Sequence, residues 1–221
     1  MESRYGRDRS LTVSELLARI ERSLLTSPSP LLVAIDGPSG AGKSTLAEMT
    51  AAPVGAAVVH GDDFYAGGSP EEWDARTPKE NSERCVDWRR LRAEALEPLL
   101  AGRQASWHAF DWHAGHGLSE RLTVCSPAPV IILEGVYAAQ PALDDLLALS
   151  VLVDPPAEIR RRHLLDREGD KAFDDWYRRW DEAETYYFRE VRPPSSFDVI
   201  IRSMPTGHSH GRAYPDQHES E

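Results

Sequence analysis

The sequence is poor in cysteine, in positive charge and in long apolar runs, and each shortage excludes a class of protein. The 221 residues include two cysteines, Cys85 and Cys125, which are too few for a disulfide scaffold and lack the spacing of a metal site. We expect reduced thiols in a cytoplasmic protein. The formal net charge is −11, which disfavours a nucleic acid polymer or an acidic membrane as partner. No apolar run is long enough to span a membrane.

The two ends of the sequence differ from its middle. Charged residues interrupt Leu11 to Leu25, and the spacing of its leucines and isoleucine predicts an amphipathic helix instead of a signal peptide. The residues from Pro205 onward are rich in glycine, histidine, serine and acids without periodicity, as is typical of a disordered tail. We therefore expect a helix within 1–30, one domain over 31–203 and a disordered tail over 204–221.

Short apolar segments alternate with helical ones through the middle of the chain. We expect strands at Leu31–Ile35, Ala56–His60, Val130–Glu134, Leu149–Asp154 and Phe197–Ile201, and helices at Asp87–Leu100 and Ala157–Asp166. This order predicts an α/β fold in which helices sandwich a parallel sheet. Polar and apolar residues alternate in Gln104–Trp112 and Arg121–Cys125, which predicts a small antiparallel flap. Loops at such insertions often carry a second substrate.

Residues 37–45, Gly-Pro-Ser-Gly-Ala-Gly-Lys-Ser-Thr, directly follow the first expected strand and match the phosphate-binding P-loop. The glycines let successive backbone N–H groups face anionic oxygens at the start of a helix. Lys43 is expected to reach the β- and γ-phosphates, and the Ser44 hydroxyl to coordinate Mg²⁺. The sequence thus predicts that a nucleoside triphosphate binds to Gly37, Ser39, Gly40, Ala41, Gly42, Lys43, Ser44 and Thr45.

Acidic residues stand where two of the expected strands end. Asp62 and Asp63 follow Ala56–His60, where a carboxylate would face the γ-phosphate and accept the proton of an attacking hydroxyl. Adjacent side chains of an extended chain point in opposite directions. One acid would therefore orient the acceptor, and the other would bind metal through water or cap a turn; the sequence leaves open which does which. Glu134 ends the central strand and is expected beside Ser44 in the metal site.

In this order and spacing, the motifs resemble the uridine kinase family of P-loop kinases. The resemblance rests on GPSGAGKST, DDFY, Val86-Asp87-Trp88, Phe110-Asp111-Trp112, Glu134-Gly135-Val136 and the arginine-rich helix after Val153-Asp154, and extends over roughly Leu31 to Ile201. It implies a P-loop NTPase fold with a helical lid. It also implies a phosphotransferase that uses ATP or GTP with Mg²⁺, and whose acceptor is the 5′-hydroxyl of a pyrimidine nucleoside such as uridine or cytidine.

The resemblance further implies a role for each acceptor-side residue. Asp62 would be the general base, Asp87 would bind the ribose hydroxyls, and Asp63 would lie beside the substrate. Tyr65 and Trp112 would be the aromatic walls near the nucleobase.

Histidines and arginines complete the set of implied site residues. His113 or His116 would read the edge of the nucleobase. Arg160, Arg162 and Arg167 would neutralise the transferring phosphate from the lid. Arg160 is also expected to bind the nucleotide.

Two departures from the family pattern leave the acceptor open. The interval Ala66–Val86 lacks the Tyr-Asp-x-Pro-like stretch of the family, and the lid carries Arg167-Glu168-Gly169-Asp170-Lys171 where the family tends to have Arg-Gly-Arg. The alternative acceptor is another small alcohol, such as a vitamin precursor, a sugar or a specialised metabolite. A nucleotide hydrolase that switches a partner is a further alternative, against which the flap and the tandem acids argue. The sequence does not determine the oligomeric state, and a homo-oligomer is compatible with it.

Overall fold

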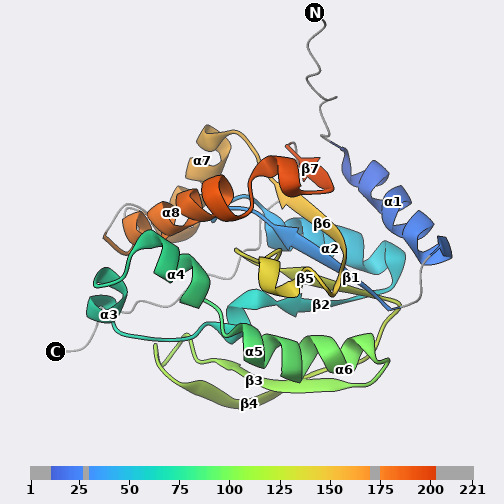
Figure 1. Cartoon of the computed structure of the whole chain (residues 1–221), viewed down its shortest axis with the longest axis horizontal. Coiled ribbons are helices and arrows are strands. Elements are labelled where there is room, and N and C mark those ends of the chain that lie inside the picture. Colours follow the sequence, from blue (N-terminus) through green and yellow to red (C-terminus); the bar gives the residue numbers. More distant parts are fainter. Residues whose placement is uncertain (1–10, 27–29, 170–174, 203–221) are drawn as a thin grey trace, which may run out of the picture.

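A computed structural model of the chain describes residues 11–26, 30–169 and 175–202. A five-stranded parallel sheet has helices on both faces, and a separate two-stranded antiparallel sheet lies beneath it in Figure 1. The α/β class and the small flap are therefore confirmed, while the expected tail over 204–221 lies outside the described residues. Across the described part of the chain, no helix has the length and apolar character needed to cross a membrane.

The main sheet has the strand order β2-β5-β1-β6-β7. Its strands are β1 (Leu31–Asp36), β2 (Ala56–His60), β5 (Val130–Glu134), β6 (Leu147–Val153) and β7 (Val199–Ile201). Every residue of β1 and β5 is buried, which explains why both are nearly unbroken apolar runs. Glu134 pairs with Ile35 on one side and with His60 on the other. The carboxyl ends of these central strands therefore lie level, at the edge where ligands of open α/β sheets bind.

Two hydrophobic clusters cover the two faces of the sheet, because alternate residues of a strand point to opposite sides. On one face, α1 (Val13–Thr26) and α2 (Lys43–Val54) pack against Val33 and Ile35. On the other face, a continuous helical run packs against Leu32 and Ala34. This run consists of α5 (Trp88–Arg90), the π-helix η2 (Leu91–Leu96) and α6 (Glu97–Leu100). The N-terminal helix thus shares the core of the main domain.

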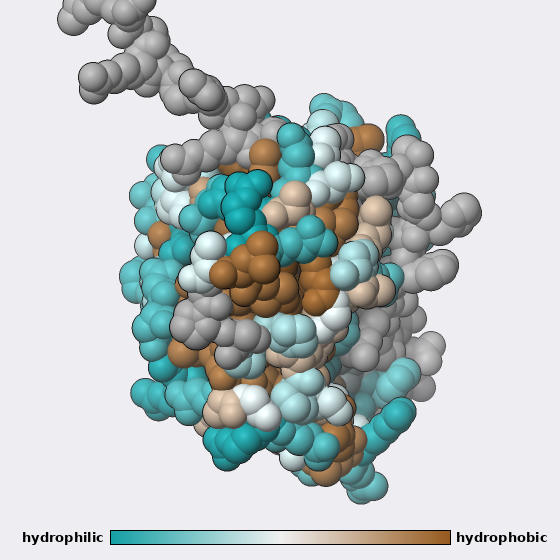
Figure 2. Space-filling view, turned by 90° about the vertical axis from the view of Figure 1, so that its right-hand side faces the viewer, coloured by the Kyte–Doolittle hydropathy of each residue, from teal (hydrophilic) through white to brown (hydrophobic). Residues whose placement is uncertain are grey.

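The remaining helices surround the edge at which the strands end. They are η1 (Gly61–Phe64), α3 (Pro70–Asp74), α4 (Pro78–Arg84), η3 (Pro141–Leu143), α7 (Ala157–Glu168), α8 (Asp175–Tyr186), the π-helix η5 (Tyr187–Val191) and η6 (Pro194–Ser196). Figure 2 looks at the opposite side of the molecule, where the strands begin, and hydrophobic residues gather there in the middle of a hydrophilic surround.

The flap is a hairpin of β3 (Ala105–Phe110) and β4 (Leu118–Cys125), and β4 begins three residues earlier than Arg121, where the sequence pattern places it. Trp107 lies on the inner face of the flap and is buried, with its ring centroid 5.5 Å from that of Phe64 in η1. Because a two-stranded sheet is only marginally stable alone, this contact with η1 and the core determines where the flap lies.

Candidate active site

The P-loop has backbone angles that require glycine. The φ angles of Gly37, Gly40 and Gly42 are 150°, 76° and 95°, values that other residues rarely adopt. A Cβ at Gly37 would lie 2.4 Å from the carbonyl oxygen of Val153, and one at Gly40 would lie 2.8 Å from that of Arg160. Helix α2 begins at Lys43, and no side chain caps its first turn. Its free N–H groups therefore form an anion site.

Lys43, Ser44 and Glu134 meet where the P-loop enters α2. The Lys43 ammonium donates to the carbonyl oxygen of Pro38 at 3.1 Å, and the Ser44 hydroxyl donates to Glu134 Oε2 at 3.1 Å. Glu134 Oε1 lies 2.6 Å from His60 Nδ1. Burial opposes the ionisation of Glu134, but the His60 hydrogen bond and the nearby Lys43 charge outweigh it, so the pKa of Glu134 lies below its ordinary value.

The pair of Ser44 and Glu134 suits Mg²⁺. Both residues present hard oxygen ligands, and Mg²⁺ in phosphate-transfer sites typically takes few protein ligands beside waters and phosphate oxygens. The Glu134 carboxylate stays ionised and is oriented by His60 on its far oxygen. These residues therefore fit the metal role that the sequence predicts for them.

The two acids after β2 lie in different surroundings. The Asp63 side chain is buried, and its Oδ2 accepts a hydrogen bond of 2.9 Å from the indole N–H of Trp107 in the flap. Asp62 is half-buried, and its Oδ1 lies 3.9 Å from the position that a Cβ at Gly135 would take. Asp63 therefore anchors the flap, and its expected place beside the substrate remains a prediction. Asp62 is left facing the end of β5, next to Glu134.

Asp87 lies close to this acidic loop. Residues 64 and 87 are joined by a hydrogen bond of 2.8 Å from the Asp87 N–H to the Phe64 carbonyl oxygen, and Tyr65 forms an isolated bridge with Val86. The Asp87 carboxylate also caps the next helix, accepting from the Arg90 N–H at 3.0 Å. Its role in binding a substrate hydroxyl remains a prediction, with one carboxylate oxygen already used by the cap.

Five aromatic side chains form what we call the aromatic cluster: Tyr65, Trp73, Phe110, Trp112 and Trp180. Tyr65 is stacked on Trp73 at 5.8 Å between ring centroids and on Trp112 at 5.0 Å. Rings at such separations are in direct contact, so no nucleobase fits between Tyr65 and Trp112. The two residues therefore form one stacked aromatic surface, and their expected place as walls near a nucleobase remains a prediction.

The two histidines expected at the base edge lie in the exposed turn of the flap. The His113 N–H donates to Asp111 Oδ1 at 3.0 Å, and His116 Nδ1 lies 2.8 Å from the carbonyl oxygen of Ala114. Both contacts stay within the turn between β3 and β4. The expected contact of His113 or His116 with the edge of a nucleobase remains a prediction.

Helix α7 rests on the P-loop with one of its faces. His163 Nδ1 lies 2.9 Å from the carbonyl oxygen of Gly40, and the stem of Arg160 comes within 3.2 Å of the Cβ position of Gly40. Arg167 lies seven residues, or about two helical turns, after Arg160 and therefore shares this face. Arg162 is exposed and lies nearly half a turn round the helix from Arg160. The expected catalytic role of Arg162 is therefore not supported by its position, whereas Arg160 is well placed.

Asp36, the last residue of β1, was not among the expected site residues. This fully buried carboxylate accepts hydrogen bonds from the N–H groups of Gly37, Tyr137 and Ala139 and from the Tyr187 hydroxyl, at 2.7 to 3.0 Å. Burial raises the pKa of Asp36 to about 6. Asp36 thereby ties the start of the P-loop to the loop after β5 and to η5. The sequence did contain a signal for this role, because Asp36 is an acid directly after the apolar run of β1.

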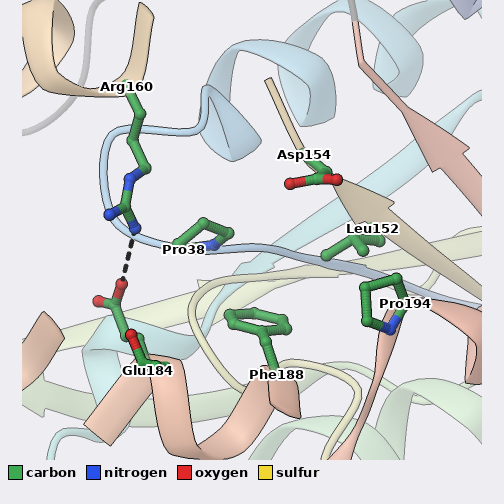
Figure 3. A pocket seen from close by; sticks show the side chains of 8 residues that line it. Pro38, Leu152, Asp154, Arg160, Glu184, Phe188 and Pro194 are labelled. Carbon is green, nitrogen blue, oxygen red and sulfur yellow. Dashed lines mark ion pairs between the residues drawn. The ribbon is translucent and has the colours of Figure 1, made fainter. Parts of the chain in front are cut away.

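The second missed residue is Glu184 of α8, which is 4% exposed. It accepts hydrogen bonds from the Ser39 hydroxyl and from the Ser39 N–H, the latter at 2.9 Å. Figure 3 shows Glu184 and Arg160 joined by an ion pair on one side of a pocket of about 160 Å³ beside the P-loop. The pocket is lined by Pro38, Leu152, Asp154, Arg160, Glu184, Thr185, Phe188 and Pro194. Glu184 lies four residues after Trp180 and three before Tyr187, on the apolar face of the helix, and an acid on that face was the available signal.

No protein-family model and no curated protein matches this chain, but solved structures do. A possible uridine kinase from Bacillus stearothermophilus is 21% identical, with 86% of this chain and 98% of that one covered and a TM-score of 0.61. A protein provisionally named a fructose transport system kinase, from Silicibacter sp. TM1040, is 22% identical, with 86% and 99% covered and a TM-score of 0.66. At these identities the likeness establishes the fold, which is that of P-loop kinases.

Proposed function

We propose that the chain is a phosphotransferase that moves the γ-phosphate of a nucleoside triphosphate, ATP in the first instance, to a hydroxyl group of a small molecule. One observation carries the proposal. The Asp62 carboxylate faces the end of β5, where Lys43, Ser44 and Glu134 meet. A loop that only binds nucleotide needs no such carboxylate, whereas transfer to an alcohol needs a group that takes its proton.

The donor half of the site neutralises phosphate charge. The N–H groups of the P-loop and the first turn of α2 would bind the phosphate oxygens, and Lys43 would leave the Pro38 carbonyl for the β- and γ-phosphates. Ser44 and Glu134 would hold Mg²⁺, which supplies charge neutralisation between the β- and γ-phosphates when bound. His60 keeps Glu134 oriented through its hydrogen bond.

The acceptor half orients the hydroxyl. Asp62 would accept the proton of the attacking hydroxyl while the oxygen lies in line with the γ-phosphate. Asp87 reaches the same region through the ladder that joins residues 64–66 to 85–87. Its remaining carboxylate oxygen would bind a second hydroxyl of the acceptor.

Two acceptor classes compete for this site. A pyrimidine nucleoside is the acceptor implied by the resemblance to uridine kinases. A sugar is the second candidate, because the mutual stacking of Tyr65 and Trp112 leaves no room for a base between these two rings. The structural neighbour named for fructose transport agrees with that class.

A coupled assay of ADP formation over a panel of nucleosides, sugars and other alcohols tests the proposal. We expect acceptor-dependent ADP formation and a phosphorylated product by mass spectrometry, both lost in Lys43→Ala. Product from uridine or cytidine would favour the nucleoside, and product from sugars alone would favour the second candidate. ATP hydrolysis that no acceptor stimulates would contradict the kinase proposal.

A further inference from the structure

Helix α8 and the π-helix η5 reach the P-loop from the face of the sheet opposite to α2. Phe188 of η5 packs in the hydrophobic cluster of that face. From the same helical run, the Tyr187 hydroxyl donates to Asp36 at 2.9 Å and Glu184 binds both the N–H and the hydroxyl of Ser39. The first residues of the P-loop are thus held by side chains that follow the lid helix in sequence.

Glu184 also contacts Arg160, a lid arginine whose stem lies against Gly40 of the P-loop. Arg160 Nη1 lies 3.7 Å from Glu184 Oε2, and Arg160 Nη2 donates to the exposed Asp181 at 2.8 Å. The stem of Arg160 crosses Gly40. One buried carboxylate therefore touches the phosphate loop and the lid arginine at the same time.

Packing alone does not explain a glutamate at this position. Burial raises the pKa of Glu184, and the Ser39 hydrogen bonds and the charges of Lys43 and Arg160 oppose that rise. An apolar side chain would fill the space without the cost of removing a carboxylate from water. The pocket beside Arg160, seen in Figure 3, leaves the guanidinium room to change partners.

We infer that Glu184 is a positioning residue for phosphoryl transfer, which holds Arg160 over the P-loop and fixes Ser39 so that Arg160 meets the transferring phosphoryl group. This inference rests on the proposed kinase function. Before transfer, Arg160 is shared between Glu184 and Asp181. The ion pair with Glu184 holds the guanidinium of Arg160 beside the P-loop. As negative charge develops on the phosphoryl oxygens, the guanidinium turns from Glu184 to these oxygens.

A double-mutant cycle on the full-length chain tests the inference, with Arg160→Gln, Glu184→Gln and the double variant. Glutamine at position 184 can still accept from the Ser39 N–H but loses the charge that attracts Arg160. We expect Glu184→Gln to lower kcat by about 10- to 100-fold and to change the KM for ATP by less than about threefold, since an interaction made only in the transition state lowers kcat and kcat/KM together. The kcat of the double variant should be at most about threefold below that of Arg160→Gln, because both changes break the same interaction.

Three controls separate positioning from folding. Glu182→Gln removes an exposed charge from the same helix and should leave kcat unchanged. Glu184→Asp keeps the charge on a shorter side chain and should recover part of the lost kcat. Thermal unfolding of each variant identifies any that fails to fold, and if Glu184→Gln does so, Glu184→Met, which also removes the charge and suits a buried site, takes its place in the cycle.

Losses that multiply in the double variant would overturn the inference, because Glu184 would then act independently of Arg160. Full activity in a folded Glu184→Gln, or a rise in KM with kcat intact, would overturn it as well. Each of these results leaves the kinase function standing, since wild-type transfer is measured first. Absence of transfer by the wild type to any acceptor would overturn both the proposed function and this inference.

Discussion

The loop that binds the donor and the flap that lies below the acceptor region are held in different ways. The backbone turn of the P-loop comes from the φ angles of three glycines and from the strand and helix that adjoin it, and Glu184 adds one remote contact at Ser39. The flap depends on distant contacts, such as the hydrogen bond between Asp63 and Trp107, 44 residues apart. A binding loop whose shape comes mainly from one segment of the chain is therefore rigid and can be recognised from the sequence. Selection of an acceptor, by contrast, depends on how remote segments pack.

Lys43→Ala should produce the largest effect, because it removes the cation that stabilises charge on the transferring phosphoryl group. We expect a loss of about 10³- to 10⁵-fold in kcat, the range seen when one transition-state cation is removed from such sites. Initial rates of ADP formation measure it, with thermal unfolding to show that the variant is folded. A loss below tenfold would mean that the donor half does not depend on this loop.

Asp62→Asn should lower kcat by about 10²- to 10⁴-fold, the usual contribution of a general base. The matched change Asp63→Asn retains an oxygen that can accept from Trp107, and we expect it to cost less than about fivefold. The ratio of the two kcat values, measured at saturating ATP and acceptor, tests the separation of the two acids. Equal losses would return Asp63 to the acceptor site.

Asp36 should make stability depend on pH. Its pKa is raised by burial from 3.8 to about 6, so between these values the native state binds more protons than the unfolded state, and stability falls as pH rises through that window. The fall amounts to about 3 kcal/mol by pH 7. Urea unfolding of the wild type and of Asp36→Asn from pH 4 to pH 7 should show it as the difference between the two curves. Parallel curves would mean that Asp36 is not buried as the structure has it.

The part of the site that could be predicted is the part that depends on sequence neighbours. β2 and β5 have the bounds that their apolar runs predict, and the P-loop begins directly after β1. Ser44 and Glu134 were correctly expected to lie together, because parallel strands end at one edge.

The rest depends on contacts between segments that are far apart in the sequence. Glu184 binds Ser39 across 145 residues, and the sequence does not tell which segment a buried glutamate will contact. The arginines of α7 show a related limit. Their periodicity separates Arg160 from Arg162, but only the contact with Gly40 reveals which face of the helix meets the P-loop.

Asp87→Ala should act mainly on the acceptor. We expect a rise of about tenfold in the acceptor KM, equivalent to one lost hydrogen bond to the substrate, with kcat changed less. The change also removes the cap of α5, at a cost of about 1 kcal/mol in stability. Asp87→Asn keeps a capping oxygen and serves as the control, so a KM effect in both variants is due to binding. An unchanged KM in both would place the acceptor elsewhere.

The smallest effect is expected from His113→Ala and His116→Ala. Both side chains are exposed in the flap turn, where the His113 backbone N–H binds Asp111 and the His116 ring contacts the Ala114 carbonyl oxygen. The acceptor KM should therefore change by less than about twofold. Titration of the acceptor at saturating ATP measures each variant against the wild type. A tenfold rise would mean that the flap closes over the bound acceptor, as loops of many enzymes do on substrate binding. The contrast between the P-loop and the flap would then hold only for the protein without bound acceptor. One of these histidines would contact the acceptor in the complex.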